Sequence, residues 1–72
     1  MEEWKILGKE EIELDTEGNF LEISLKEHPT SKEELYGISK GWKNNQGIKK
    51  YKSNIIISKE TSKKLIQALK NL

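Results

Sequence analysis

Residues 20–27 alternate between apolar and polar side chains with a period of two, and no other feature of the chain constrains its fold as strongly. Leu21, Ile23 and Leu25 fall on one side of an extended backbone, and the residues between them fall on the other. This alternation is typical of a β-strand with one buried face, because successive side chains point in opposite directions. The sequence therefore predicts a strand at 20–27, which ends before Pro29 because proline cannot donate to a ladder.

Three further strands are predicted from the same kind of pattern. The segment 4–14 alternates apolar with acidic residues after Gly8, where a kink or bulge is expected. The segments 35–43 and 48–57 flank residues 44–47, whose composition is typical of a hairpin turn. Four strands joined in sequence predict an antiparallel meander.

The last segment, 59–71, has the spacing of an amphipathic helix. Ser58 is a favourable N-cap, and Glu60 lies in the first turn, where the helix dipole favours an acid. The apolar stripe at i, i+3, i+4 and i+7 consists of Leu65, Ala68, Leu69 and Leu72, widened by Ile66. The sequence thus predicts an α+β fold of order ββββα, in which one C-terminal helix follows a four-stranded antiparallel sheet.

The chain of 72 residues is expected to form a single domain, residues 1–72, with a core near the lower practical limit of size. One short helix cannot cover a whole four-stranded sheet. The apolar area left over is most simply buried by a second copy of the chain. We therefore expect a homodimer with the helix or a sheet edge at its two-fold axis.

The composition excludes several classes of chemistry. There is no cysteine, so disulfides, thiolate metal sites and cysteine nucleophiles are ruled out. The single histidine, His28, stands before a proline at a strand end, where a structural role is more typical than catalysis. We expect no enzymatic activity, no metal and no cofactor. No apolar run approaches the ~20 residues of a membrane span, so we expect a cytoplasmic protein without membrane contact, associated with the nucleoid if bacterial.

The net charge of +1 hides a strong asymmetry along the chain. Residues 1–36 hold eleven acids and four lysines, whereas residues 37–72 hold nine lysines and one acid. A fold that gathers the second half on one side would carry a strong positive field, which attracts anionic partners.

The hairpin from Tyr36 to Lys52 combines five lysines and three aromatic residues with no acid. Single-stranded nucleic acids need this combination, because lysines follow the phosphates and flat rings stack on bases at ~1–3 kcal/mol each. Gly37 and Gly41 are expected to leave gaps where a base or backbone could approach closely. The candidate nucleic-acid-binding residues are Tyr36, Lys40, Trp42, Lys43, Lys49, Lys50, Tyr51 and Lys52.

The predicted recognition is largely independent of sequence. All thirteen basic residues are lysine, which lacks the forked guanidinium that most often specifies guanine. Alternation places Tyr36, Lys40 and Trp42 on one side of the third strand, and it separates Lys50 and Lys52 from their odd-numbered neighbours on the fourth. Which set of the fourth strand shares the face of Trp42 depends on the register and is left open. An alternative is a protein-interaction module that binds an acidic partner through the same hairpin.

Several segments together resemble the transcriptional coactivator family called positive cofactor four, which has bacterial and phage relatives. Residues 7–9 resemble its opening apolar-Gly-Lys signature. Gly18 followed by 21–28 is similar to its second strand, and residues 42–43 with 52–58 are similar to its last hairpin and helix start.

The resemblance implies a curved four-stranded sheet and a dimer whose sheets form grooves for single-stranded DNA, with RNA left open. It also implies a role in transcription or replication and phosphate contacts at Lys43, Lys50 and Lys52. The helices would meet at the two-fold axis, with interface residues Leu65, Ile66, Leu69 and Leu72. The chain departs from the family at residues 16–19, which offer neither the aromatic nor the basic residue of its first turn. The longer stretch 28–47 supplies aromatic residues instead, so the binding surface is expected to have moved toward the third strand.

Overall fold

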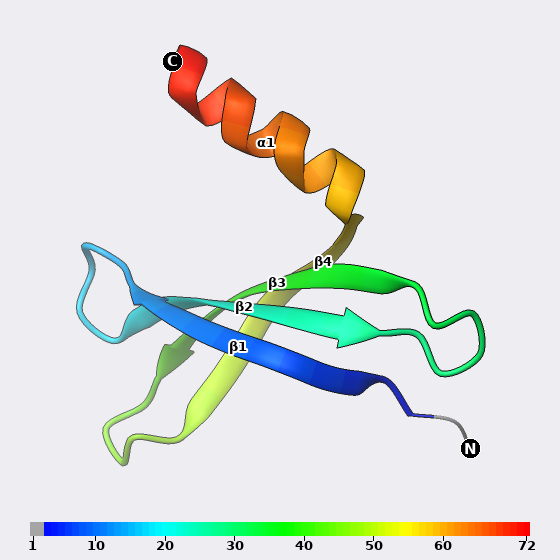
Figure 1. Ribbon diagram of the computed structural model, residues 1–72. Helices are drawn as coiled ribbons and strands as arrows, with labels where there is room; N and C mark the ends of the chain where they lie inside the picture. The colour runs from blue at the N-terminus through cyan, green and yellow to red at the C-terminus, as the bar shows by residue number, and fades with distance from the viewer. Residues whose placement is uncertain (1–2) are drawn as a thin grey trace.

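The computed structural model describes residues 3–72 as four strands followed by one helix (Figure 1). The elements are β1 (Lys5–Glu13), β2 (Asn19–Glu27), β3 (Glu34–Lys43), β4 (Lys49–Ser58) and α1 (Lys59–Asn71). The strands form one open, curved antiparallel sheet in the order β1-β2-β3-β4. This confirms the predicted α+β fold, and each element begins and ends within one residue of its expected range.

The first hairpin is shaped by two glycines. The pairing of β1 with β2 shifts register between Ile6 and Gly8, which is the bulge expected near Gly8. Gly18 adopts a φ of 83°, a conformation that glycine tolerates without strain. The turn is closed by a backbone hydrogen bond in which Leu14 N donates to Asn19 O at 3.0 Å.

The hairpin between β3 and β4 is closed by an asparagine side chain. Asn44 Oδ1 accepts hydrogen bonds from the backbone N–H groups of Gln46 at 2.9 Å and Ile48 at 3.0 Å. Gly47 provides the left-handed residue of the turn, with a φ of 78°. Residues 44–47 therefore form the turn that their composition predicts.

The loop between β2 and β3 is organised by His28. Its Nδ1 accepts hydrogen bonds from the backbone N–H groups of Thr30 at 3.1 Å and Ser31 at 3.2 Å. Its ring also packs edge-on against Trp4, with centroids 4.9 Å apart. Lys32 in the same loop has a φ of 62°, which is unfavourable for a residue with a side chain. The structural role expected for His28 agrees with these contacts.

The sheet has two faces of different character. Cross-strand partners share a face, so the register assigns every strand residue to one side or the other. The side that α1 contacts, here called the helix face, carries Leu21, Ile23 and Leu25 of β2. The opposite side, here called the open face, carries Phe20 and Ser24 of the same strand.

The buried core is small and lies on the open face. Among residues 3–72, Phe20 is the only buried hydrophobic side chain, with 1% of its surface exposed, and Ser24 is the only buried polar one. The Phe20 ring lies above Gly41 and packs edge-on against Tyr51, with centroids 5.7 Å apart. The helix face, which the sequence marks as apolar, is by contrast only half-buried.

The helix begins as predicted and then extends away from the sheet (Figure 1). Ser58 caps it by accepting a hydrogen bond from Thr61 N at 3.0 Å, and an ion pair of 2.7 Å joins Lys59 to Glu34 of β3. No helix residue is buried, and Leu69 is 64% exposed. Within residues 3–72, no helix is long and apolar enough to cross a membrane.

Candidate nucleic-acid interface

The register of the last hairpin divides the predicted binding residues between the two faces. Trp42 is paired with Lys50, whereas Lys43 is paired with Lys49. Neighbouring residues of a strand point to opposite faces, so these two pairs cannot contact the same ligand surface. Lys52 occupies the bulge created where the register shifts between Lys40 and Gly41. The register therefore decides the point that alternation leaves open: Lys50 shares the face of Trp42, whereas Lys43, Lys49 and Tyr51 lie on the opposite face.

One group lies on the helix face, at the end of the sheet distant from α1. We call it the Trp42 patch, and it consists of Lys40, Trp42, Lys50 and Lys52. Trp42 is 40% exposed and borders a hollow of about 390 Å³ that Lys52 also lines. Within residues 3–72, none of the three lysines makes an ion pair. Their charges are available to an external anion.

The second group lies on the open face and is neutralised by acids of β1 and β2. Glu11 accepts ion pairs from Lys43 at 3.0 Å and from Lys49 at 2.6 Å. Glu22 lies 3.4 Å from the same Lys49 ammonium and accepts a hydrogen bond of 3.1 Å from the Tyr51 hydroxyl. We call this arrangement the open-face network.

Glu22 has a third partner in Lys9, whose Nζ lies 3.5 Å from its carboxylate. Burial raises the pKa of the Glu22 carboxyl, but the Tyr51 hydroxyl and the charges of Lys9 and Lys49 outweigh it, so the pKa lies below its ordinary value. Hydrogen bonds from Lys49 and then Lys43 likewise lower the pKa of Glu11. The hydrogen bond to Glu11 raises the pKa of Lys49. Both carboxylates are therefore ionised at neutral pH and compete with any phosphate for these lysines.

The lysines of the open face also cover the core phenylalanine. The Nζ atoms of Lys43 and Lys49 lie 5.8 Å and 5.3 Å from the centroid of the Phe20 ring. Tyr51 is 52% exposed, but its ring packs at about a right angle to the Phe20 ring and its hydroxyl donates to Glu22. These contacts tie Tyr51 and the two lysines to the fold of the open face.

Tyr36 lies on the helix face, as alternation predicts, but away from the Trp42 patch. It lines a groove of about 250 Å³ under α1 together with Ile57 and Leu65. Tyr36 lies six positions before Trp42 along β3, which corresponds to about 20 Å. Tyr36 therefore belongs to the helix–sheet contact, and its assignment to the nucleic-acid site is not supported by this placement.

The β3 glycines leave no room for a base, and the backbone that approaches Gly41 closely is the protein's own. A Cβ on Gly41 would collide with the backbone carbonyl of Lys50 and lie 3.0 Å from the Phe20 ring. A Cβ on Gly37 would lie 3.2 Å from atoms of the Lys26 and Ser24 side chains. The space is filled by the protein itself, so these glycines serve close strand packing rather than ligand access.

The turn between β1 and β2 supplies residues that sequence analysis did not assign to the site. Lys43 N donates a 2.7 Å hydrogen bond to Gly18 O, which holds this turn against the end of β3. Glu17 and Asn19 consequently line the hollow beside Trp42. Only the cross-strand pairing of Asn19 with Trp42 brings them there, and no local sequence signal indicates that pairing.

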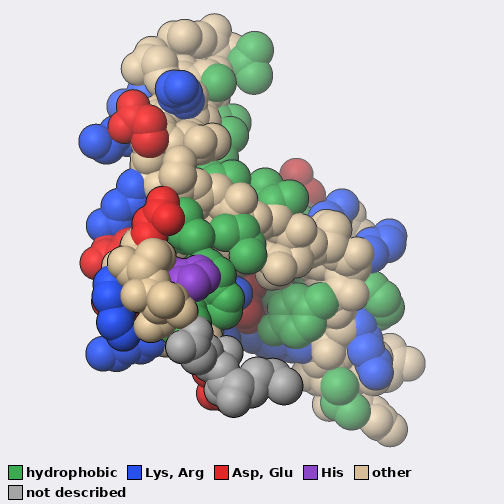
Figure 2. Space-filling model, turned by 90° about the vertical axis from the view of Figure 1, so that its right-hand side faces the viewer, with side chains coloured by type: hydrophobic (Ala, Val, Ile, Leu, Met, Phe, Trp, Pro, Cys, Tyr) green, Lys and Arg blue, Asp and Glu red, His purple; other side chains and the backbone are tan. Residues whose placement is uncertain are grey.

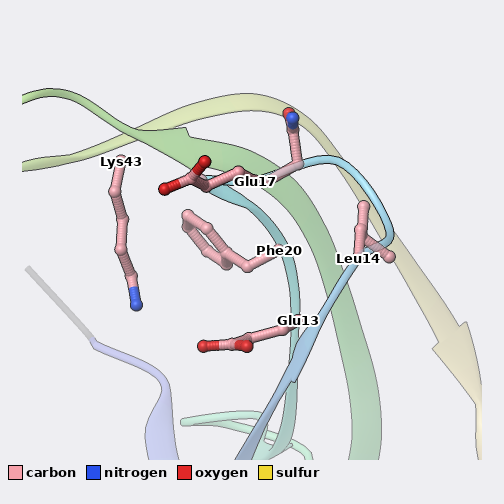
Figure 3. Close-up of a pocket in the computed structure, with 7 residues that line it drawn as sticks. Glu13, Leu14, Glu17, Phe20 and Lys43 are labelled. Atoms are coloured by element: carbon pink, nitrogen blue, oxygen red, sulfur yellow. The ribbon is translucent and has the colours of Figure 1, made fainter.

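The same turn also borders a second hollow, of about 420 Å³, on the side of the Phe20 ring (Figure 3). Figure 3 shows the Glu17 side chain extending from the turn toward the Lys43 strand, with Glu13 on the other side of the ring.

Within residues 3–72, no group of three or more histidine, aspartate and glutamate side chains could hold a metal ion.

Comparisons with protein-family models, with curated proteins and with solved structures find no match to this chain.

Proposed function

We propose that this protein binds single-stranded nucleic acid, and single-stranded DNA in particular, through the Trp42 patch. The observation that carries the proposal is the grouping, on the same face of a hairpin, of one accessible indole ring and three lysines that make no ion pair with any of residues 3–72. Lysines that have no acidic partner are free to follow phosphates, and the exposed part of Trp42 can accept a stacked base. The resemblance to the positive cofactor four family supports the same activity and a role in transcription or replication.

The open-face network makes the opposite side of the hairpin a poorer binding surface. Phosphates that approach Lys43 or Lys49 must displace the carboxylates of Glu11 and Glu22 or lie beside them. In either case the negative phosphate and the negative carboxylates repel each other, which opposes binding on this face. Of the three phosphate contacts that the family resemblance implies, we retain Lys50 and Lys52 and assign Lys43 to the network.

We propose further that the protein acts as a homodimer. Its accessible surface is 5860 Å², whereas a compact monomer of this mass exposes about 4,600 Å². Its radius of gyration is 13.9 Å, whereas a radius of gyration of about 11 Å is typical of a compact domain of this length. Its shortest dimension is only 17 Å. The excess of about 1,200 Å² is comparable with the ~800 Å² that each partner buries in a standard interface.

The apolar surface that a second copy would cover is continuous between α1 and the sheet. Figure 2 shows hydrophobic side chains at the surface of both elements. The groove under α1 has Ile38 and Ile57 on its sheet side and Leu65 on its helix side. The helix residues assigned to the interface are all exposed: Leu65, Ile66, Leu69 and Leu72. A self-complementary contact of this surface would bury the part of the helix face next to α1 in both copies, and the Trp42 patches lie at the opposite end of that face.

The test of the proposed function is a fluorescence titration with single-stranded oligo-dT at low salt. Trp4 is the second emitter, so a Trp4→Phe background isolates Trp42 while keeping an aromatic ring against His28. A stacked base is expected to quench Trp42 emission, and duplex DNA should bind more weakly. No quenching and no binding at low salt would refute the proposal. Binding of an acidic protein with no affinity for nucleic acid would instead favour the protein-interaction alternative.

A further inference from the structure

An unpaired carboxylate lies within the basic surroundings of the Trp42 patch. Glu17 lines the hollow of about 390 Å³ beside Trp42, together with Asn19, Lys43 and Lys52. Within residues 3–72, Glu17 makes no ion pair, although Lys43 and Lys52 border the same hollow. The acids of the open-face network, by contrast, are each shared between two or more lysines. Glu17 thus keeps both carboxylate oxygens available to a ligand.

The backbone brings the turn that carries Glu17 next to the strand position of Trp42. Asn19 is the cross-strand partner of Trp42, so the turn that precedes Asn19 must lie beside the ring. The hydrogen bond from Lys43 N to Gly18 O, at 2.7 Å, anchors the turn one residue after Glu17. Glu17 lines the hollows on both sides of this turn and is exposed, so its side chain can reach the space that a base stacked on Trp42 would enter.

A carboxylate at this point repels phosphate and accepts hydrogen bonds only from donors. Among the bases of a single strand, guanine presents two adjacent donors on its Watson–Crick edge, N1–H and N2–H. Thymine and uracil present one donor flanked by two carbonyl oxygens, and adenine and cytosine present a single amino group beside a ring acceptor. The two oxygens of one carboxylate match the guanine pair in a bidentate contact.

We propose that Glu17 forms a guanine subsite with Trp42: the base stacks on the indole while its N1–H and N2–H groups donate to the carboxylate. Lys52 lines the same hollow and is placed to bind the phosphate of that nucleotide. This inference rests on the proposed function and deepens it. The strand as a whole is bound without regard to sequence, and one position in it favours guanine.

The experiment compares short oligo-dT strands that differ at one central position, which is thymine, guanine, inosine or cytosine. A single guanine per strand prevents quadruplex formation, and inosine removes only the N2 amino group. Binding is measured by the quenching of Trp42 in the Trp4→Phe background. We expect the guanine strand to bind about tenfold more tightly than the all-thymine strand, and the inosine strand to bind with an intermediate affinity.

Two variants assign the preference to the carboxylate. Glu17→Gln should bind all four strands with nearly equal affinity, because an amide offers one acceptor and one competing donor. Glu13→Gln is the matched control: it removes the same charge from the neighbouring strand end, but Glu13 does not line the Trp42 hollow. It should keep the full preference for guanine.

The outcomes separate this inference from the function on which it rests. If no strand binds, the proposed function fails and the subsite fails with it. Three results would refute the subsite while the proposed function stands. They are equal binding of all four strands to the parent protein, a preference for the cytosine strand, and a guanine preference that persists in Glu17→Gln. Circular dichroism of Glu17→Gln checks that the sheet is intact, and Glu17→Asp, which withdraws the charge by one methylene, should reduce the preference without abolishing binding.

Discussion

The salt dependence of DNA binding distinguishes the two faces of the hairpin. Each lysine that neutralises a phosphate of a single strand contributes about −0.7 to the slope of log K against log salt. The three unpaired lysines of the Trp42 patch therefore predict a slope of about −2.1 per protomer. If Lys43 and Lys49 also bound phosphates, five contacts would give about −3.5.

These slopes are easily separated in a titration. Between 50 and 200 mM salt, affinity would fall by about 18-fold for three contacts and about 130-fold for five. The assay is Trp42 quenching by oligo-dT over a salt series in the Trp4→Phe background. Lys50→Gln should reduce the slope by about 0.7, whereas its neighbour Lys49→Gln should leave it unchanged.

Lys49→Gln is the matched control because it removes the same charge from an adjacent residue on the other face. A parent slope near −3.5, or a loss of slope in Lys49→Gln equal to that in Lys50→Gln, would refute the reasoning. Either result would mean that phosphates displace the carboxylate of Glu11 from its lysines.

Four further predictions concern stability and assembly. Gly41→Ala should lower the free energy of unfolding by at least about 2 kcal/mol in urea denaturation, because its Cβ would meet the carbonyl of Lys50; a neutral effect would contradict the close strand packing. Lys32→Gly should raise the free energy of unfolding by about 0.5–1 kcal/mol, because the residue has a φ of 62°; unchanged thermal unfolding would argue against strain there. Leu69→Glu should convert the dimer to a monomer in analytical ultracentrifugation, with the far-UV spectrum unaltered; a persistent dimer would exclude the helix from the interface. The pKa of Glu22 in the folded protein lies below its ordinary 4.5, so the stability that this carboxylate contributes is present above pH 4.5 and is lost as the pH falls through the folded pKa. In chemical denaturation, Glu22→Gln should therefore be less stable than the parent at neutral pH and nearly as stable as the parent at pH 2. A difference in stability that does not change with pH would contradict the ion pairs.

Much of the fold follows from local patterns because each pattern has a local physical cause. The alternation of Leu21, Ile23 and Leu25 specifies a strand whatever the rest of the chain does. Ser58 caps the helix through its own side chain, and the bulge forms beside Gly8. The α+β architecture could therefore be derived before any contact between distant residues was known.

The candidate site depends instead on contacts between distant residues. The bulge at Lys52 decides which lysines share the face of Trp42, and a slip of one residue would exchange the two faces. The ion pair between Glu11 and Lys49 connects the first and last strands through side chains, so no local window indicates it. Phe20 is buried on the face opposite the apolar alternation of β2, because Tyr51, Lys43 and Lys49 from distant parts of the chain cover it.

The placement of the ligand on the helix-face side of the hairpin is tested most directly by nuclear magnetic resonance of side-chain signals during titration with oligo-dT. We predict large shifts of the Trp42 indole protons and small shifts of the Tyr51 and Phe20 ring protons, because those rings lie on the opposite face. Large shifts at Tyr51 and Phe20 with an unperturbed Trp42 indole would contradict this prediction, and would place the nucleic acid on the open-face network instead.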